Sequence, residues 1–115
     1  MELSHRIESE ICIVYINGEV SPNTDELRTY LLPFLTDTQF KGLIINLEGV
    51  PFIGSTTVAI VLEAYQTIQN RRAHFALCQL NEINQKILSF TQINNIIDVF
   101  MTEKEAITEI LSKGA

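Results

Sequence analysis

Residues 42–57 read Gly-Leu-Ile-Ile-Asn-Leu-Glu-Gly-Val-Pro-Phe-Ile-Gly-Ser-Thr-Thr, and the rest of the chain is arranged around them. The first six residues are rich in β-branched side chains and predict a buried strand. From Val58 to Arg72 the apolar residues recur with a helical period. Three hydroxyl residues therefore stand between a strand and a helix. Free backbone N–H groups and the helix dipole favour a phosphate at such a place.

Strand and helix signals alternate along the whole chain. Strands are predicted at residues 2–8, where the signal is weak, and at residues 11–16, 43–47, 74–78 and 96–100. Helices are predicted to start near residues 23, 58, 81 and 102. This order predicts an α/β fold with about four helices and a mostly parallel sheet of four to five strands, antiparallel at its N-terminal edge. With 115 residues, the chain is expected to form one domain, residues 1–115.

Apolar spacing predicts which side of each helix is buried. In the first helix one stripe contains Leu27, Tyr30, Leu31, Phe34 and Leu35, and Pro33 lies off that stripe. We expect Pro33 to kink this helix or to end its regular part. The third helix carries the apolar residues Ile83, Ile87, Phe90 and Ile93.

The second helix has one apolar residue on its predicted outer side. A step of about 100° per residue places Val58, Val61, Leu62, Tyr65 and Ile68 around one direction. The opposite direction carries Thr56, Ile60, Glu63, Thr67 and Asn70. Ile60 is therefore expected on the solvated face, either as an isolated exposed residue or as a partner contact.

Asn81-Glu82 opens the third predicted helix, and the other three helix starts carry capping signals. Asn23 and Glu26, after Ser21, have capping-box spacing, as do Thr102 and Glu105. In the hydroxyl cluster, one of the residues at 55–57 is expected to be the N-cap. The other two would then be spare for modification, since a single hydroxyl is enough for a cap.

Composition excludes several classes of function. Eight basic against fourteen acidic residues give a net charge of −6, and Arg71-Arg72 is the one local basic pair, so no nucleic-acid partner is expected. No apolar run approaches the ~20 residues of a membrane span, and the N-terminus lacks a secretory pattern. We therefore expect a cytoplasmic protein without membrane insertion. Cys12 and Cys78, far apart and without metal spacing, are expected to be buried thiols in a reducing compartment.

An enzyme is not expected. Gly49 and Gly54 have the spacing of a P-loop, but Ser55 stands where the phosphate-binding lysine should be. A nucleophile elbow is absent, and the two histidines, His5 and His74, are far apart in the sequence. Neither a metal nor a cofactor is predicted.

Several segments in order resemble a known family. They are Gly18-Glu19-Val20, the strand at 43–47, the turn at 51–58, Cys78-Gln79-Leu80, Val99-Phe100 and Glu105-Ala106. Together they resemble a STAS domain over almost the whole chain, and more narrowly the bacterial anti-sigma factor antagonists. The motif of that family is Asp-Ser-Ser-Gly-Leu, whose second hydroxyl is phosphorylated. Here Gly54 stands at the Asp, Ser55 at the first Ser, Thr56 at the phosphorylated position and Thr57 at the Gly.

This resemblance implies a switch and not an enzyme. The unphosphorylated domain would bind an anti-sigma factor serine/threonine kinase, which would then phosphorylate Thr56 from ATP and be released. A PP2C-type phosphatase would reset the switch. The residues alone leave Ser55 open as the acceptor. Partner contacts are expected from Gly54, Ser55, Thr57, Ile60, Glu63, Ser21 and Asn23.

A second function stays open, that of a constitutive, unphosphorylated STAS adaptor, for example on the ATPase of a lipid ABC transporter or in a stress-signalling scaffold. A third, a small enzyme on a flavodoxin-like sheet, lacks a convincing set of residues. The resemblance also marks two departures outside the hydroxyl motif. Ser21 stands where the family turn has an acid, and Gln92 where the family often has glycine.

Overall fold

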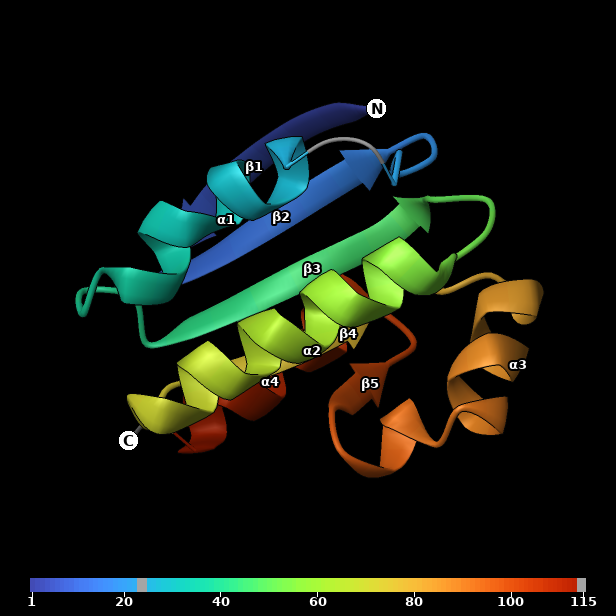
Figure 1. Ribbon diagram of the computed structural model, residues 1–115. Helices are drawn as coiled ribbons and strands as arrows, with labels where there is room; N and C mark the ends of the chain where they lie inside the picture. Colours follow the sequence, from blue (N-terminus) through green and yellow to red (C-terminus); the bar gives the residue numbers. More distant parts are fainter. Residues whose placement is uncertain (23–24, 114–115) are drawn as a thin grey trace.

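The computed structural model describes residues 1–22 and 25–113. Strands and helices follow the predicted alternation, which is therefore confirmed (Figure 1). In chain order the elements are β1 (Glu2–Glu8), β2 (Ile11–Asn17), α1 (Glu26–Thr36), β3 (Gly42–Gly49), α2 (Ser55–Asn70), β4 (His74–Cys78), α3 (Glu82–Phe90), the 3₁₀ turn η1 (Ile93–Asn95), β5 (Asp98–Phe100) and α4 (Glu103–Lys113).

The five strands form one sheet in sequence order, from β1 to β5. β1 pairs with β2 antiparallel, and all later pairs are parallel, as the sequence predicts. Because the sheet grows in one direction, crossovers of a single hand place the connecting helices on one face. Figure 1 shows α1 and α2 on one side of the sheet and α4 on the other. The carboxyl ends of β2, β3, β4 and β5 consequently meet at one edge.

Both faces of the sheet are buried at β2 and β3, whereas the edge strand β1 is mostly exposed. Val14 and Ile45 belong to the core beneath α1 and α2, whereas their neighbours Ile13 and Ile44 belong to the core beneath α4. Burial on both faces explains why β2 and β3 are almost continuously apolar in sequence. Cys12 and Cys78 lie in these cores, and burial raises the pKa of each thiol to about 12. Both cysteines therefore stay protonated at neutral pH.

The hairpin between β1 and β2 turns at Ser9 and Glu10. Both residues have positive φ, 51° and 67°, which matches a two-residue turn of the primed type. The pair Asn17-Gly18, a stronger turn signal in the sequence, instead ends β2. There Gly18 has a φ of 101° and donates its N–H to the carbonyl oxygen of Gly49 at 2.8 Å.

One expectation for α1 is corrected, and one of the two alternatives for Pro33 is excluded. The helix begins at Glu26 with Asp25 at the N-cap position, later than a capping box at 23–26 would place it. Asn23 itself lies outside the described residues. Pro33 does not end the helix, because α1 continues to Thr36. Its predicted stripe is confirmed: Leu27, Leu31 and Leu35 are buried, and Tyr30 and Phe34 pack against the core.

The buried side of α3 agrees with the prediction at Ile87, which is half-buried and packs against the core, and differs from it elsewhere. Ile83 and Phe90 are exposed, with 56% and 91% of their surface accessible, while Asn84 and Leu88 are buried. Ile93 is buried as well, but in η1 and not in the helix. The start of α3 meets the loop between β3 and α2 through hydrogen bonds, so a polar residue occupies its inner side.

Candidate functional site

The hydroxyl cluster forms the first turn of α2. The helix begins at Ser55, and Gly54 is its N-cap with extended φ and ψ of −90° and 179°. Val58 N–H makes the first helical bond, to the carbonyl oxygen of Gly54 at 3.0 Å. The prediction that one hydroxyl residue serves as N-cap is therefore wrong. A glycine does so, and it brings no side-chain acceptor.

The three hydroxyl residues differ in accessibility. Ser55 is exposed, Thr56 is half-buried and Thr57 is buried with 2% of its surface accessible. The hydroxyls of Ser55 and Thr56 make no hydrogen bond to another described residue. The first N–H groups of a helix have no partner within it, and together with the dipole they favour an anion. A Cβ atom on Gly54 would meet no atom within 4 Å, so the space beside the turn is open.

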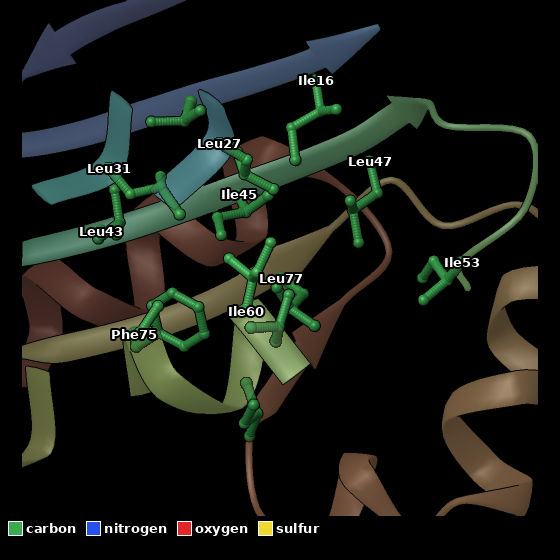
Figure 2. Close-up of a cluster of buried hydrophobic side chains, with 14 of the residues drawn as sticks. Ile16, Leu27, Leu31, Leu43, Ile45, Leu47, Ile53, Ile60, Phe75 and Leu77 are labelled. Atoms are coloured by element: carbon green, nitrogen blue, oxygen red, sulfur yellow. The ribbon is translucent and has the colours of Figure 1, made fainter. Parts of the chain in front are cut away.

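Ile60 is not on the solvated face, which corrects its predicted docking role. Only 2% of its surface is accessible, and Figure 2 shows its side chain among core residues that include Leu27, Leu31 and Ile45. The cause is the neighbouring helix. α1 packs beside α2 on the same face of the sheet and covers the flank that a helix resting on the sheet alone would expose. The exposed residues of α2 include Ser55, Ala59, Glu63 and Gln66.

Glu63 lies on the exposed side of α2, as predicted, and is paired with α1. Its Oε2 accepts a hydrogen bond from Arg28 Nη2 at 2.8 Å, and Arg28 Nη1 also reaches Asp25 at 3.2 Å. The hydrogen bond from Arg28 lowers the pKa of Glu63. Such exposed pairs contribute little to stability. Both charged side chains are accessible to a partner, because 42% of the Arg28 side chain and 56% of the Glu63 side chain are exposed. Ser21 is exposed as well.

Two asparagines at the start of α3 hold the loop that leads to the hydroxyl turn. Asn84 is completely buried; its Oδ1 accepts from Ile53 N–H at 2.9 Å and its Nδ2 donates to Val50 carbonyl oxygen at 2.8 Å. Asn81 is the N-cap of α3, accepting from Asn84 N–H at 2.7 Å, and its Nδ2 donates to Pro51 carbonyl oxygen at 3.1 Å. Sequence reasoning identified Asn81 only as a helix start and missed Asn84. The sequence signal for a buried Asn84 is its position one helical turn before Leu88, on the same side of α3.

The start of α4 lies at the same edge and is satisfied by side chains. Thr102 Oγ1 accepts from Glu105 N–H at 3.1 Å, which confirms the predicted cap, and Glu103 N–H donates to Gln79 Oε1 at 3.1 Å. The Glu103 carboxylate accepts hydrogen bonds from Arg6 and Asn46. Burial alone would raise the pKa of Glu103. The side-chain hydrogen bonds from Arg6, Tyr15 and Asn46 outweigh the effect of burial, so the pKa of Glu103 is lowered.

Within residues 1–22 and 25–113, no three His, Cys, Asp or Glu residues are grouped so that they could hold a metal ion. No helix in the described part of the chain has the length and apolar character needed to cross a membrane.

Comparison with known proteins agrees with this geometry. The model of the STAS domain family matches residues 2–106. The anti-sigma F factor antagonist of Paenibacillus polymyxa is 23% identical over 101 residues, which are 87% of this chain and 86% of that protein. A crystal structure of an anti-sigma factor antagonist from Mycobacterium paratuberculosis superposes with a TM-score of 0.86 at 17% identity, covering 95% of this chain and 92% of that one.

A further solved structure is of the phosphorylated form of the Bacillus cell fate determinant SpoIIAA. It superposes with a TM-score of 0.73 at 18% identity, covering 95% of this chain and 99% of that one. At these identities the structural likeness establishes the shared fold.

Proposed function

This chain belongs to the STAS domain family, and we propose that it is a phosphorylation-controlled binding module of the anti-sigma factor antagonist type. Unphosphorylated, it binds an anti-sigma factor serine/threonine kinase through the surface around the start of α2. Phosphorylation of Thr56 by that kinase ends the complex, and a PP2C-type phosphatase restores the binding form.

One observation carries the proposal: the first turn of α2 presents two accessible hydroxyls beside backbone N–H groups that no side chain caps. Thr56 occupies the position that is phosphorylated in the family motif. Ser55 is the alternative acceptor, since it is one residue away and more exposed. A phosphate on either oxygen would meet free N–H donors and the positive end of the helix dipole.

The reaction is a phosphoryl transfer from ATP bound to the partner. The Thr56 oxygen attacks the γ-phosphorus, the bond to the leaving ADP oxygen breaks, and the hydroxyl proton passes to a base on the partner. The phosphatase then adds water, which returns threonine and inorganic phosphate. This chain supplies the acceptor and its placement, and no catalytic group of its own is needed.

Release follows from the charge that is added at the docking surface. A phosphate brings about −1.5 to −2 charge at neutral pH, and burying it against a partner requires that its water be removed. The site already lies on a protein with a net charge of −6. The helix start accepts the anion without rearrangement, so the switch acts at the interface and leaves the fold unchanged.

Site-resolved phosphate mapping by mass spectrometry, on protein from its own growing and stressed cells, tests the acceptor. We expect phosphate on Thr56 in a fraction that changes with condition. Protein with Thr56→Val should carry none at that position and should still co-purify with the kinase. Thr56→Asp should lose the kinase and fold normally, as checked by circular dichroism.

The remaining outcomes discriminate between functions. A partner retained equally by Thr56→Asp, with no phosphate in any condition, would indicate the constitutive STAS adaptor instead. Phosphate on Ser55 alone would move the acceptor by one residue and leave the switch in place.

A further inference from the structure

Asn84 is a polar side chain in a fully buried position, and both ends of its amide are used. None of its surface is accessible, its oxygen accepts from Ile53 N–H, and its nitrogen donates to the carbonyl oxygen of Val50. An apolar residue would be sufficient to fill this place in α3. Buried amides persist where their hydrogen bonds are complete and the groups they serve have no other partner.

The two bonded groups bracket the loop that delivers α2. Val50 follows the end of β3, and Ile53 precedes the N-cap Gly54, so Asn84 ties both ends of this short loop to one point on α3. Asn81 adds a bond to Pro51, between them. The loop therefore has a single path, and the residue at which α2 begins is set by contacts made from another helix.

From this geometry we propose that Asn84 is the positioning residue for the phosphoacceptor, and that it selects Thr56 over Ser55; this rests on the function proposed above. Successive helical residues point about 100° apart, so two neighbouring hydroxyls cannot face a partner's active site in the same way. Holding the first turn at one rotation lets one hydroxyl oxygen reach the γ-phosphorus of ATP. The bonds made and broken are those described above, and Asn84 takes part in none of them.

The variant that tests this role is Asn84→Leu, which is similar in size and has no polar group. Its matched control is Gln85→Leu, the next residue of the same helix, whose amide bonds to Leu80 carbonyl oxygen and not to the loop. If Asn84→Leu does not fold, Asn84→Ser replaces it, because a single hydroxyl is too short to bridge both loop groups.

Amide hydrogen exchange reports the bracing without any partner. In Asn84→Leu we expect the N–H groups of Ile53 and Val58 to exchange about tenfold faster or more, relative to those of Ile44 and Ile45 in β3. Gln85→Leu should leave this ratio unchanged. Equal protection of Ile53 in wild type and Asn84→Leu would overturn the bracing and the proposal with it.

The ratio of phosphate on Thr56 to phosphate on Ser55 reports the selection. Lower stability alone would reduce both sites together, whereas loss of positioning should shift the ratio toward Ser55 by about tenfold. The measurement uses mass spectrometry of each variant from its own cells, in the condition where wild type is phosphorylated. A ratio unchanged by Asn84→Leu would overturn the proposal and leave the switch standing. Wild-type protein without phosphate on either residue would overturn the switch and the selection together, while exchange would still report the bracing.

Discussion

α2 and α4 both begin at the same edge of the sheet, and both carry hydroxyl residues at their starts, but the two starts are completed differently. At α4, Thr102 caps Glu105 N–H, and Gln79 accepts from Glu103 N–H. At α2, Gly54 occupies the N-cap and supplies no acceptor, although three hydroxyls follow it. The start of α4 is closed by the side chains of Thr102 and Gln79, and the start of α2 is open.

This difference between the two helix starts indicates where an added anion can bind. Each helix start provides N–H donors and a positive dipole end, so the two have similar intrinsic affinity for negative charge. At α4 two of these N–H groups already bond Thr102 and Gln79, and the Glu103 carboxylate beside them is held by Arg6 and Asn46. At α2 no side chain caps the first N–H groups, which lie beside the hydroxyls of Ser55 and Thr56. Because the space beside Gly54 is open, the start of α2 is the one suited to a phosphate.

The change that should weaken the protein most removes the Glu103 carboxylate, in the first turn of α4. We expect Glu103→Gln to lower the free energy of unfolding by about 1 to 2 kcal/mol at pH 7, because charge-assisted bonds from Arg6 and Asn46 are weakened. The folded state lowers the pKa of Glu103, so its contribution is present at neutral pH and is lost as pH falls below about 4.5. Urea unfolding at pH 7 and pH 3 measures both values.

The matched control for this change is Glu105→Gln, an exposed carboxylate in the same turn of α4. It removes the same charge near the helix dipole and should lower stability by about 0.5 kcal/mol or less. An equal loss for Glu103 and Glu105, or a Glu103 effect that does not shrink between pH 7 and pH 3, would show that the hydrogen-bond network is not the cause.

A smaller effect compares the hydroxyls of the two starts directly. Thr102→Ala should lower the unfolding free energy by about 1 kcal/mol, since it deletes a cap that is in use. Ser55→Ala should change it by less than about 0.5 kcal/mol, because that hydroxyl bonds no described residue. Thermal and urea unfolding of the two variants in parallel measure the difference. Equal losses would mean that Ser55 caps α2 in solution.

A substitution that supplies the missing cap of α2 should change stability least. Gly54→Asp places an acceptor at the N-cap of α2, where a Cβ atom meets nothing within 4 Å and the backbone is extended. We expect stability to rise by a few tenths of a kcal/mol to about 1 kcal/mol, and the gain to shrink in 1 M salt. A loss of stability would show that the space beside Gly54 is filled in solution.

Local signals were reliable where the cause was local. The capping box of Thr102 and Glu105, the start of α3 at Asn81 and the strand at 74–78 follow from neighbouring residues, and the structure agrees with each. The cap of α2 could not be predicted in this way. Its helical period was visible only from Val58, whereas the helix starts at Ser55, where Asn84 of α3 holds the preceding loop.

Ile60 shows the same limit for a helix face. Its angular position on α2 is correct, but the interpretation assumed that α2 contacts the sheet alone. α1 covers that flank, and Ile60 packs in the core with Leu27 and Leu31 (Figure 2). Likewise, Ile83 and Phe90 of α3 were assigned by apolar spacing, while the buried position went to Asn84 because the loop needed hydrogen bonds.

The α/β alternation, the buried parallel strands and the hydroxyl cluster at the junction that follows β3 can all be predicted from the sequence. These follow from side-chain period and turn chemistry, which act between residues close in the chain. Three features depend on the packing of distant segments: Gly54 at the N-cap of α2, the burial of Ile60, and the bonds from Asn84 to the loop before α2. Those outcomes depend on which helix packs beside which, and on where buried N–H and C=O groups find partners far along the chain.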